Sequence, residues 1–390
     1  MLVTISGKNV HNLGNILQHY ALQETLRKLS FEVDSVRCPL RVLPGLSLSD
    51  KITGFIDRFI RKTTKLSLAI IGVKEYRLRL IMKIRDFKKS NKPSPEVIES
   101  RRKNYSERKK IFASFYEKYI TGILESNYQE VLNSNKSRWE KYNYVVTGSD
   151  QVWSSGLVGS KAALQVYYLY FVERDKRVCY APSFGVHTLI NHYFTHKKGL
   201  KGFNKLSCRE KSGCALIKKL TGQDAQLVLD PTLLLNADDW RKISRKPDYE
   251  LPERYAVIYS YELPKEYRDI INNIAAAKNL EIIDVFDPDD KLHFLTGPQE
   301  FLYLVDHAEF VFTGSFHGTV FSINFEKNFI SFGENDARIG SILSQLGLIN
   351  RFCANINDIP SGEINYQEVN EKLNILRESS LKYLRDCLHV

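Results

Sequence analysis

Several features that would define particular classes of protein are missing from this sequence of 390 residues. Its six cysteines, at positions 38, 179, 208, 214, 353 and 387, form no CxxC pair and show no cysteine–histidine spacing. This pattern argues against a structural zinc site and favours reduced thiols in a cytosolic compartment. The sequence also lacks an internal repeat and a low-complexity tract. Repeat architectures and disordered low-complexity proteins are therefore excluded.

Long apolar runs are missing as well. The apolar run at 66–73 is far shorter than the roughly 20 residues that a membrane-spanning helix needs. The chain opens with a strand-like segment and has neither the basic start nor the cleavage site of a signal peptide. We therefore expect a soluble cytoplasmic protein. Peripheral attachment to the inner face of the membrane stays open as an alternative.

Positive charge is concentrated in one segment. The net charge is +11, yet residues 51–110 alone hold 19 Lys/Arg against 6 Asp/Glu, and the rest of the chain holds 37 against 39. Apolar residues recur there at helical spacing between the basic ones, which predicts a basic helical insertion over about 49–122. The stretch 92–95 is expected to break it, before a further helix from 105 to about 120. This insertion either binds an anionic membrane surface or packs on the body with its charges solvated. We expect no nucleic-acid partner, because no base-reading motif accompanies the charge.

The rest of the chain alternates between strand-like and helix-like segments. A strand at 2–6, a helix at 15–29 and a strand at 31–36 form a βαβ opening of the kind found in doubly wound folds. A second βα series begins at 255, after a linker-like stretch at 241–254, and includes an expected helix at 298–307. The pattern and the length predict an α/β protein of two domains, 1–240 and 252–365. A final helix at 366–390 is expected to pack back across them.

One turn near the C-terminal end stands out. An apolar strand at 310–313 meets Gly314 and Ser315 and passes directly into a helix. The free backbone N–H groups at such a helix start favour an anion, and His317 would stand beside it. The alternative is that Ser315 merely caps the helix and His317 merely packs.

Polar turns follow other predicted strands. Gly14 and Asn15 open a helix after the first strand, and Asp150, Gln151 and Trp153 follow the strand at 142–147. A carboxylate, an amide and an indole suit the hydroxyl groups and C–H faces of a sugar. Taken alone, Asp150 is better explained as a helix cap and Trp153 as a core residue.

Two arginines complete this set of turns. Arg209 and Arg338 fall near the ends of other predicted strands, and Arg209 with Glu210 could instead form a structural ion pair. Open parallel sheets bind ligands at the carboxyl ends of their strands. We therefore expect these residues to meet in one crevice between the two domains.

Five separate stretches, in this order, resemble the polysaccharide pyruvyltransferase family: His11–Gln23, Gly148–Trp153, Tyr180–Gly185, Arg209–Gly213 with Leu229–Thr232, and Ser315–Ser322. The ordered set is far more specific than any one member. Two positions depart from the family pattern. Gly314 stands where the family commonly has aspartate, and Leu13 where it has tyrosine or phenylalanine.

The resemblance implies two Rossmann-like domains in a glycosyltransferase-B-like arrangement, with the basic insertion in the first domain. It implies transfer of pyruvate from phosphoenolpyruvate to two hydroxyls of a sugar, with formation of a cyclic ketal and release of phosphate. The first domain would bind the acceptor, expected to be a lipid-linked polysaccharide repeat unit, and the second would bind phosphoenolpyruvate. The pathway would be biosynthesis of a capsule or exopolysaccharide. No cofactor and no metal are expected.

The resemblance also suggests roles for particular residues. His317 would be the catalytic acid, and Asp150 the base or the group that orients a hydroxyl. The residues expected to bind phosphoenolpyruvate, partly through the amides of the last two, are Arg338, Arg209, Ser315, Gly318 and Thr319. Those expected to bind the acceptor are Asn12, Gly14, Asn15, Gln18, Ser149, Gln151 and Trp153.

Two other functions remain alternatives. A nucleotide-sugar glycosyltransferase of the same architecture would bind a diphosphate at the turn 315–319 and release a nucleotide. A catalytically silent, membrane-associated binding subunit would use the basic insertion, and Gly314 is consistent with it because no acidic side chain stands at this position.

Overall fold

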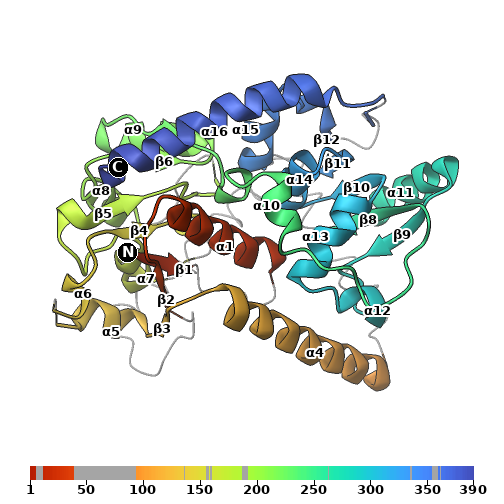
Figure 1. Ribbon diagram of the computed structural model, residues 1–390, viewed down its shortest axis with the longest axis horizontal. Helices are drawn as coiled ribbons and strands as arrows, with labels where there is room; N and C mark the ends of the chain where they lie inside the picture. Colours follow the sequence, from red (N-terminus) through yellow and green to blue (C-terminus); the bar gives the residue numbers. More distant parts are fainter. Residues whose placement is uncertain are drawn as a thin grey trace, which may run out of the picture.

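The computed structural model describes residues 1–5, 12–38, 94–135, 137–154, 158, 160–186, 192–261, 263–333, 336–353, 359–360 and 362–390. Most of the predicted insertion, residues 39–93, lies outside this part of the chain, as does His11. The described part contains two five-stranded parallel sheets and a small sheet of two strands (Figure 1).

The first sheet belongs to the N-terminal half. Its order is β3-β2-β1-β4-β5, and all of its pairings are parallel. The strands are β1 (Leu2–Ile5), β2 (Asp34–Arg37), β3 (Ile123–Glu125), β4 (Val145–Thr147) and β5 (Arg177–Cys179). Because β2 and β4 lie on opposite sides of β1, the chain reverses its direction of travel between β1 and β4. Ligands of doubly wound sheets bind at such a switch point.

The second sheet belongs to the C-terminal half. Its order is β12-β11-β10-β8-β9, again with parallel pairing throughout. The strands are β8 (Tyr255–Tyr259), β9 (Glu281–Asp284), β10 (Phe310–Thr313), β11 (Asn328–Phe332) and β12 (Phe352–Cys353). Here the switch point lies between β8 and β10. The small third sheet pairs β6 (Ser207–Cys208) with β7 (Gln226–Leu227).

Helices connect the strands and cover both sheets. They are α1 (Leu13–Lys28), α4 (Pro95–Tyr119), α5 (Tyr128–Asn133), α6 (Ser137–Glu140), α7 (Lys161–Tyr167), α8 (Tyr193–Leu200), α9 (Lys211–Thr221), α10 (Ala237–Arg241), α11 (Lys265–Lys278), α12 (Lys291–Phe294), α13 (Pro298–His307), α14 (Phe316–Asn324), α15 (Ala337–Leu346) and α16 (Tyr366–Leu388). Together the sheets and helices form two Rossmann-like units, as expected for the α/β class in a glycosyltransferase-B-like arrangement. No helix of the described residues combines the length and the apolar character needed to cross a membrane.

Two long helices join the halves on opposite sides of the molecule (Figure 1). Helix α4 follows β2 in the chain but packs on the second half, where Arg101 pairs with Asp289 at 2.6 Å. Helix α16 runs back to the first half, where the Tyr383 hydroxyl donates to the carbonyl oxygen of Cys179 at 3.0 Å. Each half therefore contributes one helix to the surface of the other.

One apolar core spans both halves. Tyr20 of α1 packs against Trp240 with ring centroids 5.7 Å apart, and Trp240 packs against Phe321 of α14 at 5.0 Å. All three rings are buried. The contact between the halves thus resembles the interior of a domain, which holds the two sheets in a fixed relation.

Two boundaries differ from the sequence-based expectation. The helix expected from 105 begins ten residues earlier, at Pro95, because the side chain of Ser94 caps it and proline is well tolerated in the first turn. The second strand is Asp34–Arg37 rather than 31–36, because its register is set by pairing with β1 and β3. The strand 310–313 and the helix 298–307 were predicted correctly.

Candidate active site

The carboxyl edges of the two sheets meet at Gly14 and His317. Gly14 lies in the first turn of α1, and His317 is the second residue of α14. A Cβ atom added to Gly14 would lie 2.1 Å from Nδ1 of His317, so only glycine allows this approach. The N-terminal turns of α1 and α14 therefore face each other across the two switch points, and both carry free amide groups.

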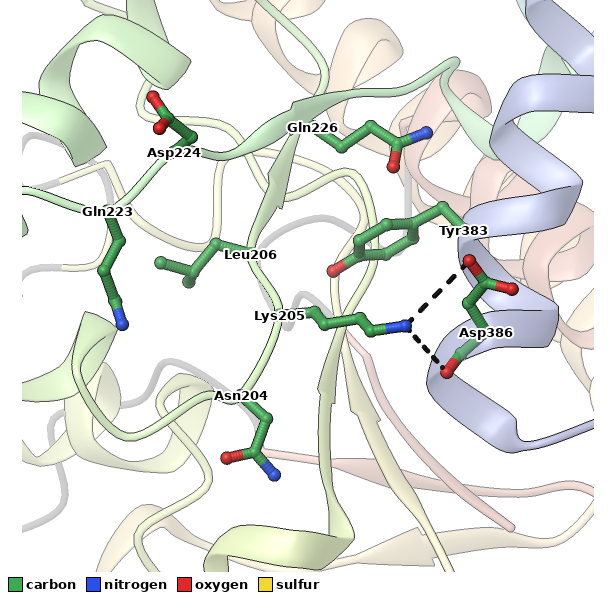
Figure 2. Close-up of a pocket in the computed structure, with 8 residues that line it drawn as sticks. All are labelled: Asn204, Lys205, Leu206, Gln223, Asp224, Gln226, Tyr383 and Asp386. Carbon is green, nitrogen blue, oxygen red and sulfur yellow. Dashed lines mark hydrogen bonds and ion pairs between the residues drawn. The ribbon is translucent and has the colours of Figure 1, made fainter.

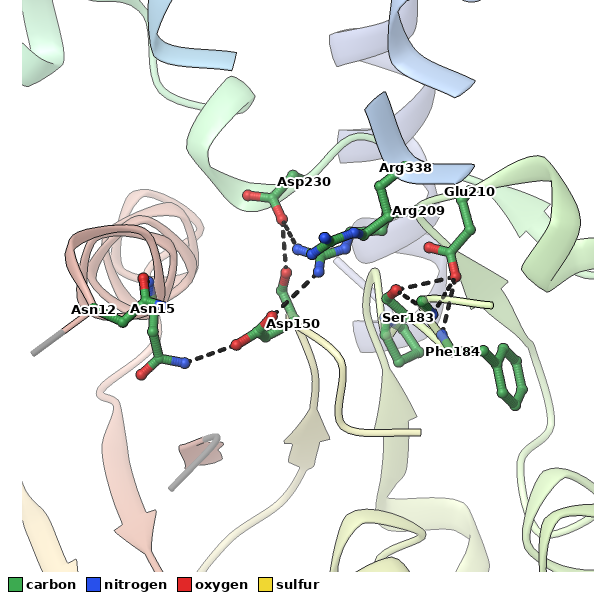
Figure 3. A network of polar contacts seen from close by, with 12 residues as sticks. Asn12, Asn15, Asp150, Ser183, Phe184, Arg209, Glu210, Asp230 and Arg338 are labelled. Atoms are coloured by element: carbon green, nitrogen blue, oxygen red, sulfur yellow. Dashed lines mark hydrogen bonds and ion pairs between the residues drawn. The ribbon is translucent and has the colours of Figure 1, made fainter. Parts of the chain in front are cut away.

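A network of charges lies on the first-half side of this contact (Figure 3). Arg209 donates to Asp230 at 2.7 Å and to Asp150 at 3.2 Å. Asn15 of α1 donates to the other oxygen of Asp150 at 2.8 Å. The side chains of Arg209 and Asp230 are fully buried, and that of Asp150 is 22% exposed. The guanidinium of Arg209 thus holds two carboxylates. One of them, Asp150, also contacts α1, the helix whose Gly14 touches His317.

The paired carboxylates are strongly acidic. Burial raises the pKa of Asp150, but the charge of Arg209 and the proximity of His317 outweigh it and hold that pKa well below its usual range. The pKa of Asp230 is lowered for the same reasons. Both groups are therefore ionised at neutral pH. A carboxylate of such low pKa is a weak base and a good hydrogen-bond acceptor.

His317, in contrast to these charged carboxylates, is uncharged at neutral pH. Burial lowers its pKa to about 4, and the nearby cations Arg209 and Arg338 act in the same direction against Asp230 and Asp150. The imidazole is consequently neutral at pH 7. Its Nε2 makes no hydrogen bond to any residue that the structure describes. A bound anion would supply both a partner for this ring and a reason for it to take up a proton.

Arg338 lies on the same side as His317. Its guanidinium is 5.6 Å from the centroid of Phe316, and that of Arg209 is 4.8 Å from the same ring. Arg338 also pairs with Asp336, at 2.6 Å, and its side chain is 19% exposed. The first residue of α14 is thus flanked by two cations, one buried and one reachable from solvent.

The amides expected to bind an anion need one correction. The N–H of Thr319 donates to the carbonyl oxygen of Ser315 at 3.1 Å, as the first bond inside α14, and so cannot serve a ligand. The free amides of a helix are those of its first residues, here Phe316, His317 and Gly318. Ser315 is the N-cap residue, but its side chain makes no capping bond. The interpretation of Ser315 as the cap is thus confirmed for its position, but not for a capping hydrogen bond from its side chain.

Three other residues that were expected to bind the acceptor differ in their surroundings. Gln18, one turn after Gly14 on α1, is buried, and its Oε1 has no partner in the described part of the chain. Asn12 caps α1 by accepting from the amide of Asn15. Ser149 donates to Asp230 at 3.0 Å.

Trp153 and Gln151 are not brought to the contact. Trp153 is fully buried and stacks on Tyr168 at 5.3 Å, so the structure favours packing over contact with a sugar. The side chain of Gln151 packs against Gly185. Asp150 does not cap a helix. It has a left-handed backbone, with φ of 69°.

Sequence reasoning missed Asp230, and of the two alternatives left open for Arg209 the structure does not show the ion pair with Glu210. Arg209 pairs with Asp150 and Asp230 rather than with Glu210. Glu210 instead accepts from the side chain of Ser183 and the amide of Phe184, and so holds the turn after β5. The motif Leu229–Thr232 contained Asp230. Only the fold places that aspartate beside Arg209.

The structure also shows the surroundings of Gly314. A Cβ atom at this position would lie 2.6 Å from Oγ of Ser260. The aspartate that the family commonly has here would therefore require Ser260 to move.

One cavity lies away from this site. A cavity of about 360 Å³ lies between the β6-β7 sheet and the end of α16, where Lys205 pairs with Asp386 (Figure 2). The described residues contain no group of three His, Cys, Asp or Glu side chains that could hold a metal ion.

The fold and this site define a two-domain α/β protein with a cationic, amide-lined turn facing a pair of carboxylates. The family model for polysaccharide pyruvyl transferase matches residues 12–336. The chain therefore belongs to the polysaccharide pyruvyl transferase family. No curated protein matches the sequence.

Two solved structures are similar in fold. One is a proposed UDP-N-acetylglucosamine 2-epimerase from Listeria monocytogenes, with 11% identity and a TM-score of 0.48, covering 98% of this chain and 89% of the other. The second is a UDP-GlcNAc 2-epimerase from Neisseria meningitidis bound to UDP-GlcNAc, with 10% identity and a TM-score of 0.47, covering 99% and 94%.

Proposed function

We propose that this chain transfers pyruvate from phosphoenolpyruvate to two hydroxyls of a sugar, forming a cyclic ketal and releasing phosphate. The observation that carries the proposal is the contact between Gly14 and His317. It places an imidazole between two helix starts and beside Arg338 and Arg209. Phosphoenolpyruvate carries a phosphate and a carboxylate, and this surrounding of cations and amides suits both.

His317 is proposed to protonate C3 of the donor. The free imidazole is neutral, because burial lowers its pKa to about 4. The charge of bound phosphoenolpyruvate would raise that pKa toward the working pH, so that His317 becomes an acid only when the donor is present. Protonation of C3 makes C2 electrophilic.

Asp150 is proposed to orient the attacking sugar hydroxyl. Its lowered pKa makes it a better acceptor of a hydroxyl hydrogen bond than a strong base. In the complete reaction both hydroxyl oxygens bond to C2 and the bond from C2 to the phosphate oxygen breaks. The two hydroxyl protons balance the proton gained by C3 and the proton that leaves with phosphate. Arg209 would hold Asp150 in place rather than bind the donor directly.

The acceptor is proposed to be a lipid-linked repeat unit of a cell-surface polysaccharide, met at the inner face of the membrane. The basic segment 51–110 would then bring the enzyme to its substrate through anionic lipids. Only its end, from residue 94, is among the described residues, and part of that charge pairs with the second half through Arg101 and Asp289. A deletion of 51–90 should reduce sedimentation with anionic vesicles while leaving the fold intact. Unchanged sedimentation would exclude this role.

The reaction can be tested by the release of inorganic phosphate. Purified protein is incubated with phosphoenolpyruvate and a panel of lipid-linked or aryl galactosides, glucosides and mannosides. We expect acceptor-dependent release and a mass gain on the sugar that matches a pyruvate ketal. His317→Ala should reduce the rate about 100-fold or more, as expected for loss of a general acid. Near-normal turnover of this variant would exclude the acid role.

Binding of the donor gives a second and independent readout. Phosphoenolpyruvate should raise the temperature of unfolding, because it binds the folded state alone. Absence of both stabilisation and phosphate release would exclude the proposed reaction. Release of a nucleotide from a nucleotide sugar would assign the chain to glycosyl transfer instead.

A further inference from the structure

Tyr259 ends strand β8 directly behind the proposed donor site. Its side chain is fully buried, and its hydroxyl makes no hydrogen bond to any described residue. Leaving a buried hydroxyl without a partner costs about 1–3 kcal/mol. The other groups of this strand end are well satisfied, since the carbonyl of Tyr259 accepts from Thr313 at 2.7 Å. The free hydroxyl is therefore a local exception.

The position of this hydroxyl is informative. The backbone N–H of Gly14 and the side chains of Ser315 and Tyr261 lie close enough to lower its pKa as weak hydrogen-bonding groups, although none of them forms a hydrogen bond of normal geometry with it. The ring itself lies against α14, because a Cβ atom at Gly318 would be 2.8 Å from Cδ1 of Tyr259. The hydroxyl thus lies where the starts of α1 and α14 face each other.

Arg108 is a second buried polar side chain near Tyr259 with atoms that lack hydrogen-bond partners. Arg108 reaches from α4 into the second half and is 1% exposed. Its Nη1 donates to the carbonyl oxygens of Val285 and Phe294, both at 2.7 Å, while Nε and Nη2 make no hydrogen bond to the described residues. No carboxylate of the described residues forms an ion pair with it. The guanidinium also lies over the rings of Phe112, Phe286 and Phe294. A buried charge without a carboxylate partner is still costly to fold, which suggests that it serves the site.

Phe286 connects the two residues. The guanidinium of Arg108 lies 5.0 Å from the centroid of the Phe286 ring, and the centroid of the Tyr259 ring also lies 5.0 Å from that centroid. Burial raises the pKa of Tyr259 to about 12, and the backbone N–H of Gly14 and then the charge of Arg108 oppose this rise. Tyr259 therefore stays protonated at neutral pH, and the arginine makes its hydroxyl a stronger donor.

We propose that the Tyr259 hydroxyl donates a hydrogen bond to the anionic donor substrate and that Arg108 is a positioning residue that strengthens this bond. The inference rests on the proposed use of phosphoenolpyruvate. It adds a neutral hydroxyl donor to the cations and amides that lie where the starts of α1 and α14 face each other. It also gives α4 a role at the site, since that helix delivers the charge.

The hydroxyl can be tested with Tyr259→Phe. We expect the dissociation constant of phosphoenolpyruvate, measured by calorimetry, to rise about 10- to 100-fold, as expected for loss of a hydrogen bond to a charged group. The thermal stability of the free protein should be unchanged or higher, because an unsatisfied buried hydroxyl is removed. Tyr255→Phe is the matched control. It lies on the same strand and is buried, but its hydroxyl donates to the carbonyl of Leu304. This control should lower stability without weakening binding.

The arginine is tested in the same assay with Arg108→Gln and Arg108→Lys. The neutral variant should weaken binding about fivefold, and lysine should restore most of the loss. In the Tyr259→Phe background, Arg108→Gln should have little further effect, because the hydroxyl through which it acts is gone. Fully additive losses would overturn the positioning role. Stability measured alongside separates this effect from simple loss of packing.

The outcomes also separate this inference from the proposed function. Wild-type binding of phosphoenolpyruvate by Tyr259→Phe would overturn the role of the hydroxyl and leave the reaction intact. A wild-type protein that neither binds phosphoenolpyruvate nor releases phosphate would overturn both.

Discussion

The two switch points of this molecule face each other but differ in chemistry. The first-half side carries two buried or half-buried carboxylates, Asp150 and Asp230, held by one arginine. On the second-half side, the described residues after β8 and β10 (260, 261, 263 and 314–317) include no carboxylate, and the carboxylate of Asp336, after β11, is paired with Arg338. They offer instead a helix start, a neutral histidine and the nearby Arg338.

This difference suggests a division of labour between the halves. An edge with fixed carboxylates accepts hydrogen bonds and so suits the hydroxyl groups of a sugar. An edge with amides and cations suits an anion, and the absence of an acid at Gly314 avoids repulsion. Gly14 is where the two edges touch. The predictions below break or sharpen this contrast, from the largest expected effect to the smallest.

The largest effect is expected from Gly14→Ala. The new methyl group would lie 2.1 Å from Nδ1 of His317, so the ring or the start of α1 has to move. A displacement of about 1 Å at a reacting group costs about 100-fold in rate, and we expect a loss of that order in kcat/KM for phosphate release. The control is Gly340→Ala in α15, where a Cβ atom meets nothing within 4 Å. It should leave activity unchanged and raise stability slightly. Wild-type activity of Gly14→Ala would mean that the two edges do not meet as described.

The next effect concerns the arginine that holds the acidic edge. Arg209→Met leaves Asp150 and Asp230 without their common partner, and should lower the free energy of unfolding by about 3–5 kcal/mol. Denaturant titration measures this loss. The comparison is Arg254→Ala, which breaks a solvent-exposed pair with Glu309 and should cost at most about 1 kcal/mol. Equal losses in the two variants would show that the buried pair has no special role.

A third prediction concerns protons taken up with the donor. Free His317 has a pKa of about 4, and a bound anion should raise it. At pH 6, binding of phosphoenolpyruvate should therefore add up to one proton per protein, seen as a dependence of the calorimetric heat on the ionisation enthalpy of the buffer. His317→Asn should remove this uptake. The same uptake in the variant would assign the proton to another group.

The smallest effect is on the pH dependence of stability. The pKa of His317 is about 4 in the folded protein and 6.5 in the unfolded chain. The unfolded state therefore binds a proton first as the pH falls, so stability is lost from about pH 6.5 down to about 4. His19 and His196, with pKa values lowered to about 3, act in the same direction. His317→Asn should reduce the slope of stability against pH in this window by up to one proton. An unchanged slope would contradict the lowered pKa.

Much of the fold could be predicted from local patterns. The strand 310–313 and the helix 298–307 were predicted correctly, because buried parallel strands are continuous apolar runs and α13 has one apolar face. The early start of α4 was missed, because Ser94 and Pro95 were interpreted as a break rather than as a cap and a first turn. Serine and proline at the end of an element are compatible with both a break and a helix start, so the sequence pattern alone does not distinguish the two.

The candidate site was predicted less completely. His317, Gly14, Asn15, Asp150 and Arg209 were selected and do lie together. Trp153 was selected for its residue type, yet it is fully buried in the core. Asp230, Tyr259 and Arg108 were not selected. Asp230 lies in the motif Leu229–Thr232, but its pairing with Arg209 depends on the fold. The sequence neighbourhoods of Tyr259 and Arg108 give no sign of a role, because their importance depends on what lies beside them in space.

The sequence by itself determined the α/β class, the order of strands and helices, and the turns where polar residues follow strands. Those features depend on interactions between residues near each other in the chain. Only the tertiary structure decided which turns meet, that Arg209 pairs with Asp150 and Asp230 rather than with Glu210, and that α4 carries Arg108 to the second half. The pKa values of the site follow from the same assembly, because burial and charge pairing exist only after distant segments have packed together.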